Sequence, residues 1–146
     1  MMNPLKSLLL PVALFAAFAL SACDALPTVP DEQPPLEGAT IGGPFQLTDN
    51  HGEAKSWADF EGKYRIVYFG FAYCPDVCPN DLSITTRGLL GFAKQNPELA
   101  ANIQPIFITI DPARDTPEVL TEFVANFHPD GIPNQLIGLT GTAAQI

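Results

Sequence analysis

The sequence predicts an α/β domain in which helices flank a mostly parallel central sheet, with a β-hairpin at its N-terminal end. Apolar runs rich in β-branched and aromatic residues recur along the chain, and segments with helical apolar spacing separate them. Strands that alternate with helices in this way are typical of parallel β-α-β units. The periodicity leaves open whether the domain has two or three layers.

Residues 1–22 have the pattern of an export signal. Lys6 is the only charged residue before position 24, and the almost wholly apolar run Leu8–Leu20 follows it. This run is too short to cross a bilayer comfortably. The segment Leu20-Ser21-Ala22-Cys23 resembles the lipobox of bacterial lipoproteins. That resemblance implies cleavage before Cys23, lipidation of its thiol and attachment to the outer face of a bacterial membrane. The alternative is a plain signal peptide or an uncleaved anchor with an incidental cysteine.

Residues 23–40 are expected to form the lipidated cysteine and a tether. The stretch 24–40 contains four prolines and four acidic residues with few apolar ones, so it cannot bury a core. In an extended polyproline conformation it would reach roughly 50 Å, at about 3.1 Å per residue. A tether of this length would let the domain of residues 41–146 meet a membrane-bound partner.

The domain begins with a predicted hairpin. Residues 45–48 alternate between apolar and polar, and Asp49-Asn50-His51-Gly52 is a turn signal. His51 is therefore expected to be a solvated turn residue. Residues 56–63 are predicted to form a helical turn that ends at Gly62.

The next two elements are a strand and a helix. The near-continuous apolar run Arg65–Tyr73 predicts a central strand that is buried on both faces. Pro79–Gln95 partly follows a helical period, and Pro79 suits a first-turn position. Gly88 and Gly91 weaken this helix, and they suggest that it packs closely against the sheet.

The remaining elements complete the alternation of strands and helices. Ile103–Ile110 predicts a second buried strand. Asp115 or Thr116 is expected to cap a helix that has Pro117 in its first turn. Residues 135–139 are expected to form a third strand.

Cys74 and Cys78 are the most informative pair of residues. They lie between the predicted central strand and the following helix, where a parallel sheet presents its carboxyl edge. Two thiols at this spacing can form a disulfide, bind a soft metal, or do each in turn. Export would allow the disulfide to form and persist. Because Cys78 falls near the helix N-terminus, it is predicted to be the more acidic thiol.

The charge of the chain excludes one class of partner. The formal net charge is −9, and removal of residues 1–22, which contain one lysine, makes it −10. Nucleic-acid binding requires basic patches, so no nucleic-acid partner is expected.

Several sequence blocks, taken together, resemble the Sco/SenC family. The blocks are Gly42–Phe45, Tyr68–Phe71, Cys74–Pro79, Phe107–Pro117 and Ile137–Gly141. The resemblance implies a thioredoxin-like fold and a membrane-tethered protein that binds copper. It implies delivery of that copper to the binuclear copper site of cytochrome c oxidase, with a periplasmic copper donor or thiol reductant as a further partner.

The resemblance also implies a set of ligands: Cys74, Cys78 and a histidine. The family's histidine segment lies downstream of the last matched block, so we expect the third ligand beyond residue 146 and an incomplete C-terminal part of the domain. His128, next to Pro129, does not match that segment and is expected to interact with a helix terminus.

One alternative function uses the same two thiols. It is a thiol–disulfide oxidoreductase that reduces the cysteines of the apo-oxidase subunit or of another exported protein. The usual redox signature has two residues between its cysteines, whereas three separate Cys74 from Cys78. The wider loop favours a metal clamp. A peroxidase is a weaker alternative, and a purely structural disulfide is the remaining one.

Overall fold

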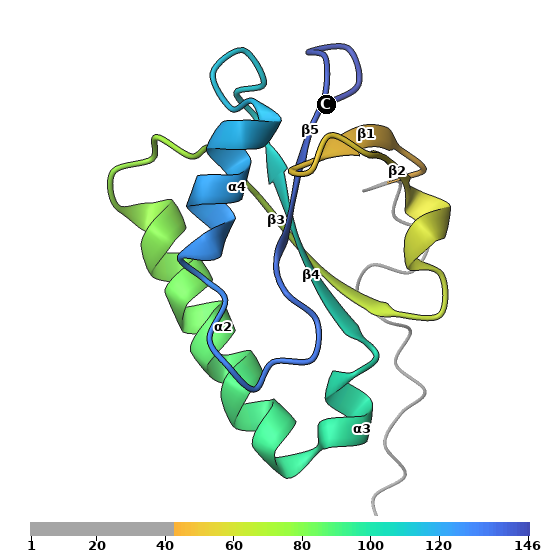
Figure 1. The fold of residues 1–146 in the computed structure, drawn as a ribbon, viewed down its shortest axis with the longest axis vertical. Helices are drawn as coiled ribbons and strands as arrows, with labels where there is room; N and C mark the ends of the chain where they lie inside the picture. The colour runs from red at the N-terminus through yellow and green to blue at the C-terminus, as the bar shows by residue number, and fades with distance from the viewer. Residues whose placement is uncertain (1–42) are drawn as a thin grey trace, which may run out of the picture. The chain divides into compact units, whose positions relative to one another are not determined.

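The computed structural model describes residues 43–146. The expected signal peptide, Cys23 and the tether lie outside these residues. The described elements, shown in Figure 1, are β1 Gln46–Asp49, β2 Ala54–Ser56, the 3-10 helix η2 Trp57–Phe60, β3 Tyr64–Gly70, α2 Val77–Gln95, α3 Pro97–Ala100, β4 Ile103–Thr109, α4 Pro117–Ala125 and β5 Ile137–Thr140. None of the helices in this range combines the length and the apolar character that crossing a bilayer requires.

The strands form one mixed sheet with the order β2-β1-β5-β4-β3. β3 runs parallel to β4, and β4 runs parallel to β5. β1 runs antiparallel to both β2 and β5. The α/β class is as predicted, but the sheet is not mostly parallel. The reason is that the predicted hairpin, β1 and β2, joins the same sheet and contributes two antiparallel pairings.

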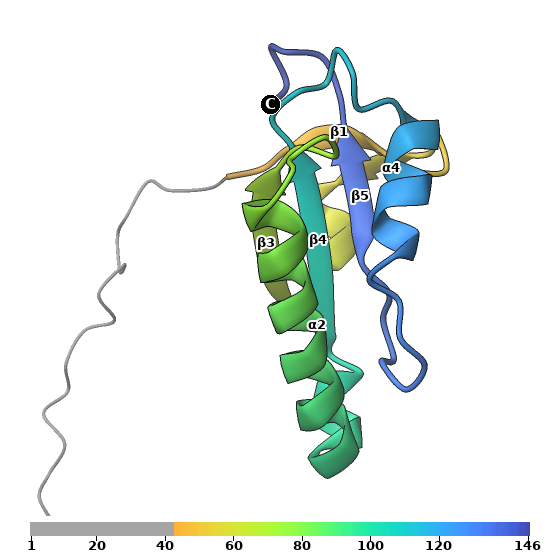
Figure 2. The same ribbon diagram turned by 90° about the vertical axis from the view of Figure 1, so that its left-hand side faces the viewer.

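The two longer helices cover the same face of the sheet, as Figure 2 shows for α2 and α4. Each belongs to a crossover between parallel strands: α2 links β3 to β4, and α4 links β4 to β5. Their apolar side chains form a core cluster with the sheet that comprises Leu82, Phe107, Leu120, Val124, Phe127 and Leu136. A second cluster lies on the opposite face and comprises Leu47, Phe60, Ile106, Ile108 and Leu139. The sheet and the two helices α2 and α4 thus form two layers. The two core clusters together bury both faces of β4.

Strand β3 differs from the prediction in its position. It lies at the edge of the described sheet, with β4 as its neighbour, and it ends at Gly70. Two of its aromatic side chains are largely exposed, Tyr64 at 73% and Phe69 at 59%. The strand buried on both faces is β4, in which Ile106 and Phe107 are fully buried. A continuous apolar run cannot separate these two cases, because burial depends on which strands become its neighbours.

Helix α2 begins two residues before the predicted start, so that Pro79 is its third residue. Pro79 fits there, because the first amides of a helix have no partner within it. The expected close packing of Gly88 and Gly91 is wrong. A methyl group added at either position would meet no atom within 4 Å. The prediction was based on the presence of two glycines, which have a weak helix propensity. That propensity does not show which atoms lie next to them.

Two local predictions are confirmed. Thr116 caps α4, since its Oγ1 accepts a hydrogen bond from the amide of Val119 at 3.4 Å. His51 is exposed in the turn between β1 and β2, where Gly52 takes the left-handed conformation at φ 85°. The third predicted strand is β5, shifted toward the C-terminus by one to two residues.

Replacement of the two exposed helix glycines should stabilise the domain. We expect Gly88→Ala and Gly91→Ala each to raise the free energy of unfolding by about 0.5–1 kcal/mol, because alanine loses less backbone entropy in a helix. Urea unfolding of the purified chain, followed by circular dichroism, measures the change.

Gly138 in β5 provides the contrasting control. A methyl group there would lie 3.1 Å from Val124 Cγ1 and 3.2 Å from Leu120 Cβ. Gly138→Ala should therefore destabilise the chain through overpacking. If Gly88→Ala or Gly91→Ala destabilised it as well, the helix would pack differently from the description above.

Candidate metal and thiol site

The two cysteines that the sequence singled out come together at the carboxyl end of β3. Cys74 lies in the turn after the strand, where its amide donates to the carbonyl of Phe71 at 3.1 Å. Cys78 lies in the first turn of α2. Both are free thiols and both are buried, with 8% of Cys74 and 4% of Cys78 exposed. The structure therefore brings the two cysteines together as a pair of shielded thiols at the edge where parallel sheets place their ligands.

The start of α2 is organised around the sulfur of Cys74. Asp76 is the N-cap residue, yet its side chain makes no capping hydrogen bond. Instead the backbone N–H of Cys78 donates to Cys74 Sγ at 3.3 Å. Pro75, between them, disfavours helical backbone at Cys74 and so keeps that residue in the turn. The unpaired amides of the helix thus point at the sulfur of Cys74.

This arrangement reverses the predicted order of acidity. The pKa of Cys74 lies below its ordinary value, first because the Cys78 side chain donates a hydrogen bond to it, and further because the backbone amides of Cys78, Asp76 and Val77 do. The pKa of Cys78 is raised, first by burial and then by its hydrogen bond with Cys74. The prediction assumed that the amides and dipole at the N-terminus of α2 stabilise the thiolate of Cys78, which lies inside the helix. The amides actually face the sulfur that precedes it.

Tyr68 on β3 is a site residue that the prediction missed. Its Oη donates to Asp81 Oδ2 at 3.0 Å, and Asp81 lies in α2, one turn after Cys78. Burial raises the pKa of Tyr68, and hydrogen bonds with Cys78 and Asp81 raise it further. Tyr68 therefore stays protonated and connects the buried thiol of Cys78 to a half-buried carboxylate. Tyr68 belongs to one of the blocks that carry the family resemblance, Tyr68–Phe71, but the sequence alone does not show that its hydroxyl contacts α2.

Gly70 forms the wall of the site behind Cys78. A methyl group on Gly70 would lie 2.9 Å from Tyr68 Cε1, 3.0 Å from Phe107 Cε2 and 3.1 Å from Cys78 Sγ. The first distance is shorter than real side chains tolerate, and the other two are tight. Glycine is thus required because the sulfur and two rings converge on its backbone.

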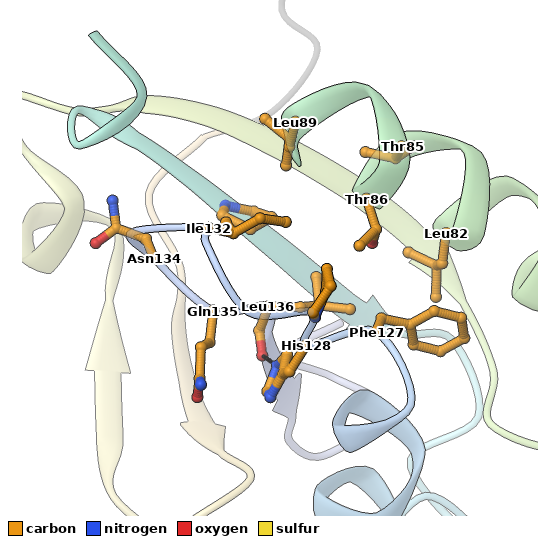
Figure 3. A pocket seen from close by; sticks show the side chains of 12 residues that line it. Leu82, Thr85, Thr86, Leu89, Phe127, His128, Ile132, Asn134, Gln135 and Leu136 are labelled. Atoms are coloured by element: carbon orange, nitrogen blue, oxygen red, sulfur yellow. Dashed lines mark hydrogen bonds between the residues drawn. The ribbon is translucent and has the colours of Figure 1, made fainter. Parts of the chain in front are cut away.

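The two histidines lie elsewhere. His128 follows α4 and its Nε2 is 2.9 Å from the carbonyl oxygen of Leu136, so its partner is this carbonyl and not the helix terminus that was expected. Figure 3 shows it beside Leu136 at a cavity of about 20 Å³, which neither cysteine lines. A cavity of that size holds about one water molecule and no organic substrate. Within residues 43–146, no cluster of three or more His, Cys, Asp or Glu side chains could hold a metal ion.

The arrangement suits two kinds of chemistry. A thiolate at Cys74 beside the protonated thiol of Cys78 is a nucleophile with a neighbour that can resolve a mixed disulfide. Once both are deprotonated, the same pair is a soft two-sulfur clamp of the kind that Cu(I) prefers. The shielding of both sulfurs limits access to water in either case.

Comparisons with known proteins show which proteins this chain is similar to. The model of the SCO1/SenC family matches residues 33–146. A SCO2-like protein of Rickettsia prowazekii is 45% identical over 106 residues, which is 73% of this chain and 47% of that protein. The structure of yeast Sco1 with copper bound is similar with a TM-score of 0.60 and 43% identity, over 71% of this chain and 53% of that one.

A bacterial structure extends the comparison. A SCO1/SenC family lipoprotein from Bacillus anthracis has a TM-score of 0.57 and 30% identity, over 68% of this chain and 56% of that one. The chain spans about half the length of these relatives. The predicted thioredoxin-like fold of the family is confirmed, since Sco proteins are the structures to which the described domain is similar.

The two thiols should differ in their reactivity with pH. We expect iodoacetamide to label Cys74 first, with a rate midpoint below the ordinary thiol pKa of about 8.5. Cys78 should react more slowly and with a higher midpoint, because burial disfavours its thiolate. Mass spectrometry of the reduced chain between pH 6 and pH 9 measures both rates.

Cys78→Ala provides an internal check on the cause. Alanine removes the side-chain donor to the Cys74 thiolate, so the midpoint of Cys74 should move upward in this variant. Faster labelling of Cys78 than of Cys74 in the unmodified chain would contradict the assignment.

Proposed function

Because the chain belongs to the SCO1/SenC family, we propose that it is a copper metallochaperone tethered to a membrane. It binds copper through Cys74 and Cys78 and delivers it to the binuclear copper site of cytochrome c oxidase. The observation that carries the proposal is the pair of shielded, free thiols at one helix N-terminus. The copper found in the similar yeast Sco1 structure supports the choice of metal.

The residues present fit copper better than harder cations. Cu(I) is soft and prefers thiolate sulfur, whereas Mg²⁺ and Ca²⁺ require oxygen ligands. Asp76 lies between the two thiols in sequence, but a carboxylate is a poor partner for Cu(I). Metal binding requires both thiolates, so it releases protons and should weaken as the pH falls. The raised pKa of Cys78 makes this thiol the one that limits binding at low pH.

The proposal assigns the third ligand, a histidine, to polypeptide downstream of residue 146. Neither His51 nor His128 is a candidate, because His51 lies in the β1–β2 turn and His128 contacts Leu136. The proposed partners are the copper-bearing oxidase subunit and a periplasmic copper donor or thiol reductant. The acidic charge of the chain would suit a cationic surface on such a partner.

The second candidate function is thiol–disulfide exchange on the oxidase subunit or another exported protein. The unequal acidity of the two thiols favours it. Cys74 thiolate would attack a disulfide of the target, and one target sulfur would leave as a thiolate. Cys78 would then attack Cys74 in the mixed disulfide, which releases the reduced target and forms the Cys74–Cys78 disulfide. An external dithiol reductant must then restore the pair.

Copper titrations test the leading proposal. We expect the reduced chain to bind a single Cu(I) in competition with a colorimetric chelator. Cys74→Ser and Cys78→Ser should each weaken binding by at least about tenfold, because each removes one soft ligand.

His51→Ala and His128→Ala are the matched controls, and neither should alter the affinity. Wild-type affinity in both cysteine variants would refute copper binding at this site. If copper binding failed while the reduced chain reduced a model disulfide and became oxidised at Cys74 and Cys78, the second candidate function would stand in its place.

The location of the protein is a separate proposal. We infer a bacterial lipoprotein that faces the periplasmic or extracytoplasmic side, with residues 1–22 removed, Cys23 lipidated, residues 24–40 as the tether and residues 41–146 as the Sco domain. The lipobox-like segment Leu20–Cys23 supports this, and one similar SCO1/SenC protein is itself a lipoprotein. Several acyl chains would make the attachment stable, because a single chain binds only marginally.

Replacement of the proposed lipid-bearing residue tests the location. Cys23→Ala should abolish lipidation, so the protein should lose its added lipid mass and move from the detergent phase to the aqueous phase. Phase partitioning and intact mass spectrometry of membrane fractions follow both changes. The Cys74→Ser protein is the control that should remain anchored. A Cys23→Ala protein that kept its lipid mass and partitioning would overturn the assignment.

A further inference from the structure

A buried carboxylate lies behind the turn that carries Cys74. Asp115, in the loop between β4 and α4, has no exposed surface. Its Oδ2 accepts hydrogen bonds from the amide of Ala72 at 2.9 Å and from Thr109 Oγ1 at 2.5 Å. Its Oδ1 is buried and has no partner within the described residues. A carboxylate that is buried and only half satisfied is costly, so packing alone does not account for it.

The hydrogen bond to Ala72 links this carboxylate to the position of Cys74. Ala72 is the second residue of the turn in which the amide of Cys74 donates to the carbonyl of Phe71. Thr109, the other partner of Asp115, ends β4 and is paired in register with Gly70, which ends β3. The carboxylate therefore bridges the ends of the two strands just where the cysteine turn leaves the sheet.

The residue next to Asp115 holds the same turn from the solvent side. The Arg114 guanidinium lies 5.3 Å from the ring centre of Tyr73 and 6.0 Å from that of Phe71. An ion pair with Asp111 orients it. Ala72 is thus fixed by a carboxylate on its inner side, while the aromatic residues on either side of it lie near a cation. Such contacts at an exposed site are each worth little, so the inner contact is the stronger one.

We propose that Asp115 is a positioning residue for Cys74. It holds the backbone of the turn so that Cys74 Sγ faces the first amides of α2, as its hydrogen bond with Cys78 N–H requires. This inference rests on the proposed function only in that the position of Cys74 matters for its chemistry. The proposed role is geometric. Loss of Asp115 shifts the midpoint pH of Cys74 reactivity in one direction if the role is geometric and in the opposite direction if it is purely electrostatic.

The sign provides the test. Removal of a nearby negative charge, taken alone, favours the thiolate and lowers the pH at which Cys74 becomes reactive. Loss of the anchor has the opposite effect, because Cys74 then moves away from the amides that stabilise its thiolate. Asp115→Asn in the metal-free, reduced full chain should therefore shift the midpoint of Cys74 alkylation upward. The expected shift is about half a pH unit or more, equivalent to about a threefold loss of thiolate.

The pH profile also separates a change in the pKa of Cys74 from a change in the access of the alkylating reagent to its sulfur. A looser turn can expose Cys74 and raise its limiting rate at high pH, but only its position against the amides changes the midpoint. Hydrogen–deuterium exchange provides a second readout. The amide of Ala72 should exchange faster in Asp115→Asn than in the wild-type chain, because it loses its charged acceptor.

A milder pair of variants applies if Asp115→Asn does not fold. Thr109→Val removes the second donor to Asp115 with little change of shape, and Thr109→Ser retains a hydroxyl. Thr109→Val should shift the midpoint upward, and Thr109→Ser should restore it. Arg114→Ala, on the outer side, should change it less than Asp115→Asn does.

Two outcomes overturn the proposal. The first is an unchanged or lower midpoint in both Asp115→Asn and Thr109→Val. The second is an equal shift in Thr109→Val and Thr109→Ser, which would show that the hydroxyl contact is irrelevant. Copper is absent from all these measurements, so a failure of the wild-type chain to bind Cu(I) would refute the proposed function and leave this test intact.

Discussion

The parallel pairing of β3 with β4 is the constraint on which the site depends. Seven residues of each strand pair in register, from Tyr64 with Ile103 to Gly70 with Thr109. Both strands therefore end at the same level, and the loops that follow them leave the sheet side by side. The first loop carries Cys74 and leads to Cys78 in the first turn of α2, and the second loop carries Arg114 and Asp115. A slip of the register by one residue would turn Tyr68 away from α2 and separate these loops.

The two thiols differ in acidity because their surroundings differ. Cys74 accepts a hydrogen bond from the helix start, whereas the buried sulfur of Cys78 converges with the rings of Tyr68 and Phe107 on the bare backbone of Gly70. A more acidic thiol beside a less acidic one suits both a nucleophile with its resolving partner and a metal clamp that forms in two deprotonation steps. The same geometry thus suits both proposed functions, and the order in which the thiols lose their protons is common to both.

Local signals in the sequence predicted much of this domain. The hairpin, the cap at Thr116 and the placement of Cys74 and Cys78 at the strand–helix junction all followed from turn chemistry and periodicity. The errors concern properties that depend on distant neighbours. The run of β3 has the composition of a central strand, but its burial depends on the strands beside it. The acidity of the thiols depends on where the helix amides point, which requires the conformation of the turn.

The missed site residues share this cause. Tyr68 contacts Asp81 across 13 positions and Asp115 contacts Ala72 across 43. The sequence predicts either Asp115 or Thr116 as the cap of α4, with Pro117 in the first turn of the helix. The structure gives the cap to Thr116 and turns Asp115 inward to the cysteine turn. A local sequence pattern cannot decide which of these two adjacent polar residues caps the helix, because the decision depends on contacts with distant residues.

In the sheet of residues 43–146, β3 is an edge strand, and this position has a consequence for behaviour in solution. An edge strand leaves half of its amide and carbonyl groups free to pair with another chain, and Tyr64, Ile66 and Phe69 add exposed apolar surface to it. Charge repulsion between copies opposes such pairing, because the chain has a net charge of −9 and a pI of about 4.3. That protection weakens as the solution is acidified or as salt screens the charges. Colloidal stability of this chain is therefore an electrostatic property, and it should be lowest in mildly acidic buffers of high ionic strength.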